Sequence, residues 1–381
     1  MMKQSMPLSQ LPIVKSDRFQ TLHSKWDLYI PFMELGMQLL KVNGNMTMIV
    51  PYPLTNQIYA KKLREMFVDK YDMFEIVDLK DVKVFEATVQ NCIPFVRKNE
   101  TQGKTIISNM IDNKIQHSFV QGHERLIQDK KSLVWNLTKE SRETGKHASM
   151  KTLGDYCYIS KGMVLNADEK KAKGEFKKAD LISFTKDEIH CKKYIEGKDI
   201  DKFIIKRVRY LEWGTKRSPQ QLSRPTFEEL YTSKKLLFNC LGELKVAIDL
   251  SGDFYCEQAI RVAVLWSDLK NVNNKSISGV LKKYSTYSRQ EMEHFSETMD
   301  LRFILGIMNS TYGSKLLSDI RGGDYHIVPE HIRAIPIPDA SVSEQQILIN
   351  IVEKIMQSGE NTSKELLAAL DKEVYRLYKL E

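Results

Sequence analysis

The chain is poor in the features that mark secreted, membrane-spanning or metal-bound proteins. Its 381 residues include five cysteines, an odd number without a Cys-x-x-Cys pair, which argues against a disulfide framework and against a zinc site. No apolar run reaches the ~18 residues that a membrane span requires. Residues 1–7 lack the apolar core of a signal peptide. The sequence therefore predicts a cytoplasmic protein with reduced thiols and no bound metal.

Positive charge is in modest excess, and its distribution is more informative than its size. The net charge is +8, from 57 Lys and Arg against 49 Asp and Glu. Such a balance permits nucleic-acid binding and is equally compatible with a solvated basic surface. Cations crowd residues 170–235, where aromatic residues such as Tyr194, Tyr210 and Trp213 are interleaved with them. This segment is the candidate for a nucleic-acid contact.

The first quarter of the chain alternates helix-like and strand-like patterns. Leu28, Phe32, Leu35 and Leu39 recur at helical spacing after Asp27, a residue suited to cap a helix. Residues 46–50 form a short, nearly continuous apolar run, typical of a strand buried on both faces of a parallel sheet. Alternation of this kind indicates a doubly wound α/β sheet. The expected elements are helices over 28–41 and 55–68 and strands over 46–50, 73–79, 88–96 and 105–111.

The pattern changes after residue 111. Residues 112–150 are polar and mixed in charge, which predicts a linker or bridging segment. Over 151–340 short strand-like runs lie between turns without βαβ order, which predicts an α+β domain. Two capping-box sequences, Ser343–Gln346 and Thr362–Glu365, predict a C-terminal segment of two amphipathic helices. In detail, we expect strands over 156–160, 235–240, 245–250 and 258–265, a surface loop over 267–290 and the C-terminal helices over 341–381.

Three stretches of the first quarter resemble parts of a known enzyme family. Trp26–Phe32, Ile49–Tyr52 and Val84–Val89 are similar, in order and spacing, to the second half of N6-adenine DNA methyltransferases from type II and type IIG restriction–modification systems (Eco57I/TaqI-like). The resemblance implies use of S-adenosylmethionine and of a base taken out of the duplex. It also implies that Phe32 lines the cofactor's adenine pocket and that Phe85 stacks on the flipped base. Packing of each aromatic into the protein core is the alternative.

Two motifs of that family are absent from the sequence. No Asn-Pro-Pro-Tyr tetrapeptide occurs, and no glycine-rich strand-to-helix turn resembles the family's cofactor loop. The resemblance therefore implies that residues 1–111 are the distal half of a Rossmann-like methyltransferase domain, inactive alone and unable to hold the cofactor alone. A partner subunit or an N-terminal methyltransferase half would supply the rest. A sheet without those strands would leave the strand at 46–50 unpaired along one edge.

Much of the remaining chain resembles the target-recognition domains of the same enzymes. Leu153–Gly162, Tyr194–Ile200 and Ile304–Ser310 are among the similar stretches, so the resemblance implies that the region 151–340 binds double-stranded DNA. Arg and Lys position proteins on phosphates, and Arg also reads base edges. The residues chosen as candidate contacts are Arg207, Arg209, Lys216, Arg217 and Arg224.

The sequence leaves other functions open. A non-enzymatic specificity subunit that recruits a separate modification or cleavage subunit would need the DNA-binding region but not the methyltransferase-like one. An unrelated α/β protein with a basic face is a third interpretation. Glu243-Leu244-Lys245 fits the Glu-x-Lys of metal-dependent nucleases, but no suitably placed acidic residue precedes it, so we interpret it as the edge of a strand.

Overall fold

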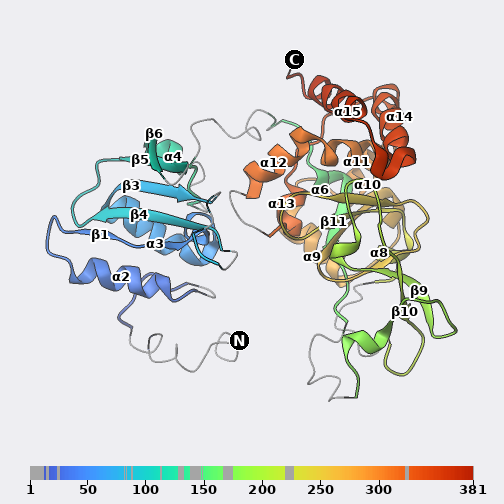
Figure 1. The fold of residues 1–381 in the computed structure, drawn as a ribbon, viewed down its shortest axis with the longest axis horizontal. Coiled ribbons are helices and arrows are strands. Elements are labelled where there is room, and N and C mark those ends of the chain that lie inside the picture. The colour runs from blue at the N-terminus through green and yellow to red at the C-terminus, as the bar shows by residue number, and fades with distance from the viewer. Residues whose placement is uncertain are drawn as a thin grey trace. The chain divides into compact units, whose positions relative to one another are not determined.

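The chain folds into two compact units (Figure 1). Unit 1 comprises residues 1–142 with 322–325, and unit 2 comprises residues 143–321 with 326–381. None of the described helices combines the length and the apolar character that a membrane crossing needs. The computed structural model describes residues 13, 17–23, 26–80, 82, 84–86, 89–111, 114–127, 133–137, 147, 149–165, 175–218, 227–321 and 326–380.

Unit 1 is built on a six-stranded sheet with the order β1-β4-β3-β5-β6, in which β2 also pairs with β4. The central strand β4 runs antiparallel to β1, β2 and β3, so these three strands run in the same direction. β3 pairs in parallel with β5, and β5 pairs antiparallel with β6. The strands are β1 (Asn45–Thr47), β2 (Val50–Pro51), β3 (Asp72–Leu79), β4 (Asn91–Arg97), β5 (Lys104–Ile111) and β6 (Lys114–Gly122).

This sheet confirms a mixed α/β architecture but not the doubly wound arrangement. Among the described strands of this sheet only β3 and β5 pair in parallel, because β4, the next strand in sequence after β3, pairs with β3 in antiparallel orientation. The expectation of a linker over 112–150 is wrong for 114–126, where β6 and α4 (His123–Leu126) extend the sheet. An edge strand with many polar residues resembles a linker in sequence. Its only sequence signal is the alternation of apolar and polar residues that burial of one face produces.

Helix α2 (Tyr29–Leu39) packs one side against this sheet. Its buried residues include Tyr29, Ile30, Met33 and Met37. The predicted cap at Asp27 is wrong, since its Oδ1 accepts only the adjacent N–H of Leu28 and the helix starts without a side-chain cap.

The single helix expected over 55–68 is a series of shorter turns. They are η3 (Tyr52–Thr55), η4 (Ile58–Ala60), α3 (Lys61–Glu65) and the π-helical turn η5 (Met66–Lys70). The fully buried Arg64 explains the irregularity, because its guanidinium donates to the carbonyls of Leu54, Gln57 and Leu133 over 2.6–2.8 Å. The Leu54 carbonyl is thus satisfied by a side chain, and the Gln57 carbonyl accepts from Arg64 in addition to the N–H of Ala60.

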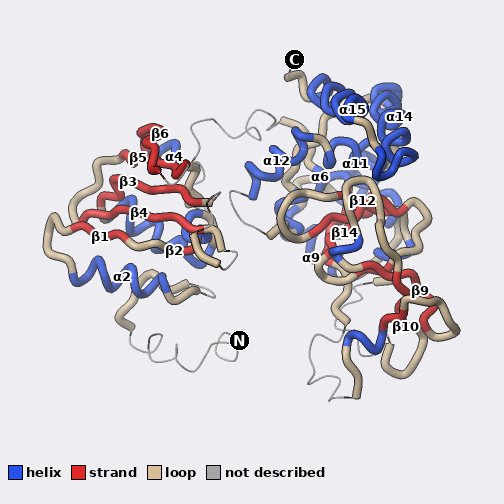
Figure 2. The backbone as a smooth tube through the Cα atoms, viewed as in Figure 1, coloured by secondary structure: helices blue, strands red, loops and turns tan. Residues whose placement is uncertain are grey.

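The central sheet of unit 2 separates two hydrophobic cores. It has the order β12-β11-β14-β7, and all neighbours are antiparallel. Two of its strands, β12 and β14, are labelled in Figure 2. Leu236 and Phe238 of β11 enter one core, whereas Leu237 enters the other. Because both faces are covered, these strands are apolar at nearly every position instead of at alternate ones. The strands are β7 (Cys157–Lys161), β11 (Lys235–Asn239), β12 (Val246–Asp249) and β14 (Ile260–Leu265), close to the four that the sequence predicts.

A second, smaller sheet of unit 2 has the order β13-β9-β10-β8. β10 is antiparallel to both β8 and β9, and β13 is parallel to β9. Figure 1 shows β9 and β10 at the end of unit 2 that is remote from the C-terminal helices. The strands are β8 (Ile182–Ser183), β9 (His190–Ile195), β10 (Arg209–Glu212) and β13 (Tyr255–Cys256).

Helices cover the central sheet, and one of them, α9 (Lys275–Tyr284), lies within the surface loop expected over 267–290, while α10 (Arg289–Ser296) begins at the end of it. α9 begins at Asn274, whose side chain accepts the N–H of Ser276, and α10 begins with a capping box at Ser288. The polar composition of α9, which fully buries only Ile277, concealed its periodicity.

The two predicted C-terminal helices are present. α14 (Val342–Ser358) starts two residues before the predicted box, with Ser341 as its cap, and α15 (Lys364–Leu377) is capped by Ser363. Both contribute apolar residues to the same core as α11 (Leu301–Asn309). The remaining elements of unit 2 are α6 (Leu153–Tyr156), η6 (Lys178–Leu181), η7 (Gly197–Asp199), α8 (Glu229–Thr232), η8 (Trp266–Leu269), α12 (Thr311–Arg321), α13 (Pro329–Arg333) and η9 (Gly359–Asn361).

Candidate functional site

Two of the motif segments emerge at the same edge of the unit 1 sheet. Pro51 at the end of β2 and Leu79 at the end of β3 both pair with Asn91, the first residue of β4. The chain that leaves β2 at Tyr52 and the chain that leaves β3 toward Phe85 therefore start side by side. Carboxyl ends of strands that run in one direction are where open α/β sheets bind ligands.

Polar side chains hold this edge together. Tyr52 Oη donates to Asp78 Oδ2 over 3.2 Å, and Asp78 Oδ1 accepts the N–H of Lys80 over 2.9 Å. Asn91 is buried, with its Nδ2 donating to Val50 O over 3.4 Å, and its Oδ1 has no hydrogen-bond partner among the described residues. A buried amide oxygen without a partner is unfavourable. Asn91 therefore leaves an acceptor at this edge.

Phe32 lies on the exposed side of α2. Its side chain is 59% exposed, and Leu28 and Leu39 on the same side are 43% and 73% exposed. Three of the four residues predicted to form the apolar face of this helix are thus exposed, and the fourth, Leu35, is partly buried. Phe32 is therefore not packed into the core of unit 1. Its role as a wall of the cofactor pocket stays a prediction.

Phe85 is also exposed. It lies between β3 and β4, is 48% exposed, and follows Val84, which is 37% exposed. A loop aromatic folded onto the core would be largely buried. Its stacking on a flipped base stays a prediction.

Phe32 and Phe85 alone do not form a pocket for S-adenosylmethionine. Cofactor sites bury most of the ligand surface. The side chains of Phe32 and Phe85 are each about half exposed, so each supplies at most one wall. That this chain alone does not hold the cofactor stays a prediction.

In unit 2, Arg209 is buried instead of exposed. It is 3% exposed, its Nη1 hydrogen-bonds to Asp199, and the same atom lies 3.3 Å from Glu196 Oε2. Glu196 also pairs with Lys178 over 2.7 Å. In this arrangement Arg209 ties β10 to the segment after β9, a structural role that its place in a basic run did not indicate.

Arg217 is likewise engaged by a carboxylate. Its Nε lies 2.9 Å from Glu212 Oε1, and its Nη2 lies 2.5 Å from Glu212 Oε2. The Arg217 guanidinium lowers the pKa of the Glu212 carboxyl, and this effect outweighs the opposing effect of burial. The pair fixes the turn that follows β10.

Arg207 and Lys216 are the exposed members of the predicted set. They precede and follow β10, and neither side chain has a hydrogen bond or ion pair within the described part of the chain. Arg224 lies outside the described residues. The structure therefore brings Arg207, Arg209, Lys216 and Arg217 to one small sheet but leaves only two of them free to meet a ligand.

Sequence reasoning missed a buried ion pair in the central sheet. Lys235 Nζ lies 2.5 Å from Asp249 Oδ2, and both side chains are fully buried. Burial lowers the pKa of Lys235, although Asp249 opposes this shift. Asp249 also accepts the N–H groups of Gly252 and Phe254, so the pair organises the turn between β12 and β13. No signal in the sequence linked Asp249 to Lys235, because the two residues meet only when β11 pairs with β12.

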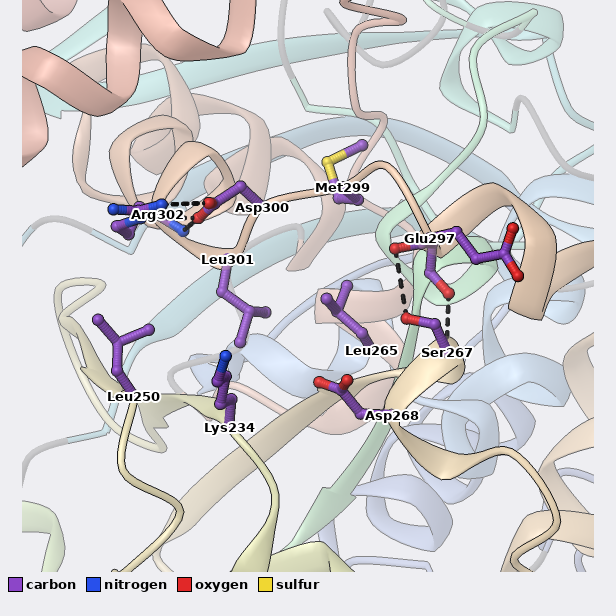
Figure 3. A pocket seen from close by; sticks show the side chains of 11 residues that line it. Lys234, Leu250, Leu265, Ser267, Asp268, Glu297, Met299, Asp300, Leu301 and Arg302 are labelled. Atoms are coloured by element: carbon purple, nitrogen blue, oxygen red, sulfur yellow. Dashed lines mark hydrogen bonds and ion pairs between the residues drawn. The ribbon is translucent and has the colours of Figure 1, made fainter. Parts of the chain in front are cut away.

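A cavity of about 440 Å³ lies beside this sheet (Figure 3). Lys234 and Asp268 line it together with apolar side chains that include Leu250 and Leu301. Burial raises the pKa of Asp268, and the Lys234 charge opposes the shift. None of the site residues predicted from the sequence lines this cavity.

Metal-dependent nuclease chemistry finds no support at Glu243. Its carboxylate is 68% exposed and pairs with Lys202 over 2.8 Å. Lys245 pairs instead with Asp201 over 3.1 Å. Across the described residues, no group of three or more His, Cys, Asp or Glu side chains is placed to hold a metal ion.

Comparison with known proteins identifies the relatives of the chain. Residues 2–85 match the family model of the Eco57I restriction-modification methylase. Type II methyltransferase M.BstVI of Geobacillus stearothermophilus is 33% identical over 92 residues, which cover 24% of this chain and 16% of that protein. Type II methyltransferase M.XhoI of Xanthomonas vasicola is 35% identical over 72 residues, 19% of this chain and 13% of that protein. The predicted resemblance to restriction–modification methyltransferases is confirmed.

The structural likeness extends over both units. A solved structure of the type IIL restriction–modification enzyme MmeI in complex with DNA matches 99% of this chain and 52% of the MmeI chain, with a TM-score of 0.55 at 9% identity. At that identity the match shows a shared fold. The chain spans about half the length of MmeI, and its matched segments cover less than a fifth of the curated methyltransferases. The first quarter of the chain is thus similar to restriction–modification methyltransferases.

Proposed function

We propose that this chain is the C-terminal part of a site-specific N6-adenine DNA methyltransferase of a restriction–modification system. In this proposal unit 2 recognises DNA, and unit 1 supplies part of the cofactor and base pockets. The observation that carries it is the match of residues 2–85 to a methylase family. The proposal is also supported by two of the motif segments, which leave the sheet side by side next to Asn91.

Unit 1 has two features that favour a missing partner. Among the described residues, β1 and β2 pair only with β4, so their other edge is open. The side of α2 that carries Leu28, Phe32 and Leu39 is exposed. A methyltransferase half on another segment or on a partner subunit would pair with the edge and cover the apolar side. The chain alone would then be inactive.

The cofactor and base pockets would be shared with that half. In the complete enzyme S-adenosylmethionine supplies the methyl group, and Phe32 would form one wall of the pocket for its adenine. Phe85 would stack on the target base after its extraction, an interaction worth ~1–3 kcal/mol per base in single-strand binders. The Asn-Pro-Pro-Tyr and glycine-rich segments would come from the other half.

DNA would be held by the free cations of unit 2. Arg207 and Lys216 flank β10, are exposed and carry no ion pair within the described residues. Arg209 and Arg217 would act indirectly, by fixing the sheet between them. The MmeI structure, which was determined with DNA, supports the use of this fold on a duplex. Such an enzyme would act in the cytoplasm.

Two binding measurements on the chain test this proposal. Affinity for a mixed-sequence DNA duplex should fall steeply with salt, because each phosphate contact releases counterions. Titration calorimetry with S-adenosylmethionine should show no tight binding. A salt-independent DNA affinity would refute the DNA-binding role, and tight cofactor binding would refute the incomplete pocket.

A non-enzymatic specificity subunit is the second candidate. It accounts for unit 2 but not for the match of residues 2–85 to a methylase family, which therefore does not favour it.

A further inference from the structure

The two sheets of unit 2 differ in exposure. Both faces of sheet β12-β11-β14-β7 contribute to hydrophobic cores. Sheet β13-β9-β10-β8 places Tyr194 and Leu211 in one core, while Lys193 and Tyr210, their neighbours in sequence, are partly exposed. Successive residues of a strand point to opposite faces. The second sheet therefore has one face on the core and one face toward solvent.

A row of side chains crosses the solvent face. Tyr210 of β10 pairs with Lys193 of β9 on one side and with Ser183 of β8 on the other. Phe254, which precedes β13, lies next to Lys193, whose Nζ is 5.4 Å from the centre of the Phe254 ring. Lys193 also pairs with Asp253 over 2.8 Å. The row thus alternates aromatic rings with a cation on an open sheet surface.

The surroundings of the row are positively charged. Residues 175–218 contain twelve Lys and Arg against eight Asp and Glu, an excess of four out of the +8 of the whole chain. Several of these carboxylates already hold cations of the same segment, but Arg207 and Lys216, before and after β10, remain free within the described residues. The excess charge is therefore available at both ends of the strand that carries Tyr210.

Tyr210 is the residue of the row with unused hydrogen-bonding capacity. Its hydroxyl makes no hydrogen bond within the described part of the chain, and the side chain is partly exposed. Tyrosine hydroxyls donate to phosphate oxygens, and aromatic rings pack on sugars and bases. A two-stranded β-ribbon fits the major groove of DNA.

We propose that the solvent face of sheet β13-β9-β10-β8 is the surface that docks on duplex DNA, with Tyr210 in direct contact and Lys193 beside it. This inference rests on the proposed DNA-binding function and assigns it to one face of one sheet. Arg207 and Lys216 bracket the contact on phosphates.

The chain carries its own reporter for this face. Cys191 lies two residues before Lys193 in β9 and so points to the same side. Among the five cysteines it is the exposed one, since three are buried and Cys240 is intermediate. The rate of alkylation of Cys191 by a maleimide, followed by peptide mass spectrometry, therefore reports coverage of the face. Cys240 serves as the internal control.

The expected result is slower alkylation of Cys191 at saturating duplex, with Cys240 unchanged. Binding itself is measured separately by fluorescence anisotropy of the labelled duplex. No binding at any salt concentration would defeat the proposed function. Binding that leaves the Cys191 rate unchanged, or that slows both cysteines equally, would overturn the docking face while leaving DNA binding intact.

Two substitutions separate the ring from the hydroxyl. Tyr210→Phe should weaken DNA binding about 2- to 10-fold, as expected for the loss of one hydrogen bond, with an unchanged salt slope. Tyr210→Ala should weaken it further, because the ring contact is also lost. Tyr375→Phe, a partly buried tyrosine of α15, is the matched control and should bind like the unaltered chain. Unchanged affinity of both Tyr210 variants, with native circular dichroism, would overturn the contact.

Discussion

Units 1 and 2 differ in how completely each buries its own apolar surface. In unit 2 the strands of the central sheet send alternate side chains into two cores, and helices α11, α14 and α15 close one of them. In unit 1 helix α2 is apolar on two sides, and only the side with Ile30, Met33 and Met37 is buried. The other side exposes Phe32 and Leu39 by 59% and 73%.

The difference indicates which unit is self-sufficient. Contiguous exposed apolar surface marks an interaction site, and an unpaired strand edge invites another strand. Both occur in unit 1, around α2 and along β1 and β2, within the segment that matches the methylase family. Unit 2 covers both faces of its central sheet with its own residues, so we expect it to fold without help.

The largest effect should come from breaking the buried pair of unit 2. Asp249→Ala would leave the Lys235 ammonium buried without its counter-charge, a loss of about 3–5 kcal/mol in the free energy of unfolding. Urea unfolding, followed by tryptophan fluorescence, measures it. The double variant Lys235→Met/Asp249→Leu should recover most of the loss, because no uncompensated charge remains.

An exposed ion pair is the control for that experiment. Lys270 and Glu297 pair over 2.6 Å, with side chains 48% and 41% exposed. Lys270→Ala should change the free energy of unfolding far less than Asp249→Ala does, because solvent screens the pair. Equal effects of Asp249→Ala and Lys270→Ala would contradict the structural role of the buried pair.

The two sides of α2 give the next largest effect. Met37→Ala removes a fully buried side chain and should destabilise unit 1 by about 2–5 kcal/mol. Leu39→Ala, two residues further on the exposed side, should change stability by no more than ~0.5 kcal/mol. Hydrogen exchange of β3 and β4 amides reports both. A large loss from Leu39→Ala would mean that unit 1 already buries this side.

The sequence predicts elements well where one physical cause dominates. The strands over 235–240 and 258–265 are evident as apolar runs because both of their faces are buried. The C-terminal helices are evident because capping residues precede amphipathic segments, although the caps are Ser341 and Ser363 and not the predicted Ser343 and Thr362. β6, α9 and the turns around Arg64 escape prediction, because polar edge residues and a buried side chain that satisfies carbonyls leave no periodic signal.

Candidate residues are predicted by type, but not by their partners. A basic run suggested equal roles for Arg207 and Arg209, yet Arg209 is buried against Asp199 and Arg207 is exposed. Which arginine meets a carboxylate depends on strand register and on the segment 196–199, both of which are tertiary. The helical period of α2 similarly identified an apolar side without showing that a second, more buried one exists.

A smaller effect should distinguish the free from the paired cations. Arg207→Ala removes one phosphate contact, so the slope of log affinity against log salt should become less steep by about 0.9, the value for one released counterion on duplex DNA. Lys270→Ala removes the same charge from a residue that is paired with Glu297 and should leave the slope unchanged. Equal slopes for the two variants would place the duplex elsewhere on the molecule.

The smallest effect concerns acid stability of the segment that leads to Arg207. Asp201 pairs with Lys206 over 2.9 Å and with Lys245 over 3.1 Å. The pKa of Asp201 is lowered from 3.8 to about 2. Partial burial alone would raise this pKa, but the hydrogen bonds from these groups outweigh the effect of burial. Because the folded-state pKa is the lower one, the carboxylate stabilises the fold above about pH 4, and this contribution is lost as pH falls through about 2.

Asp201→Asn therefore removes stability at pH 6 and much less at pH 2, where the carboxyl is partly protonated. The difference at pH 6 should be below ~1 kcal/mol, because the side chain is 32% exposed and the pair is screened. Glu188→Gln, in the exposed segment between β8 and β9, is the control and should show no pH-dependent difference. If the Asp201→Asn difference persisted at pH 2, the charge of Asp201 would not be its cause, and the ion pairs would not be what holds the Arg207 segment against β12.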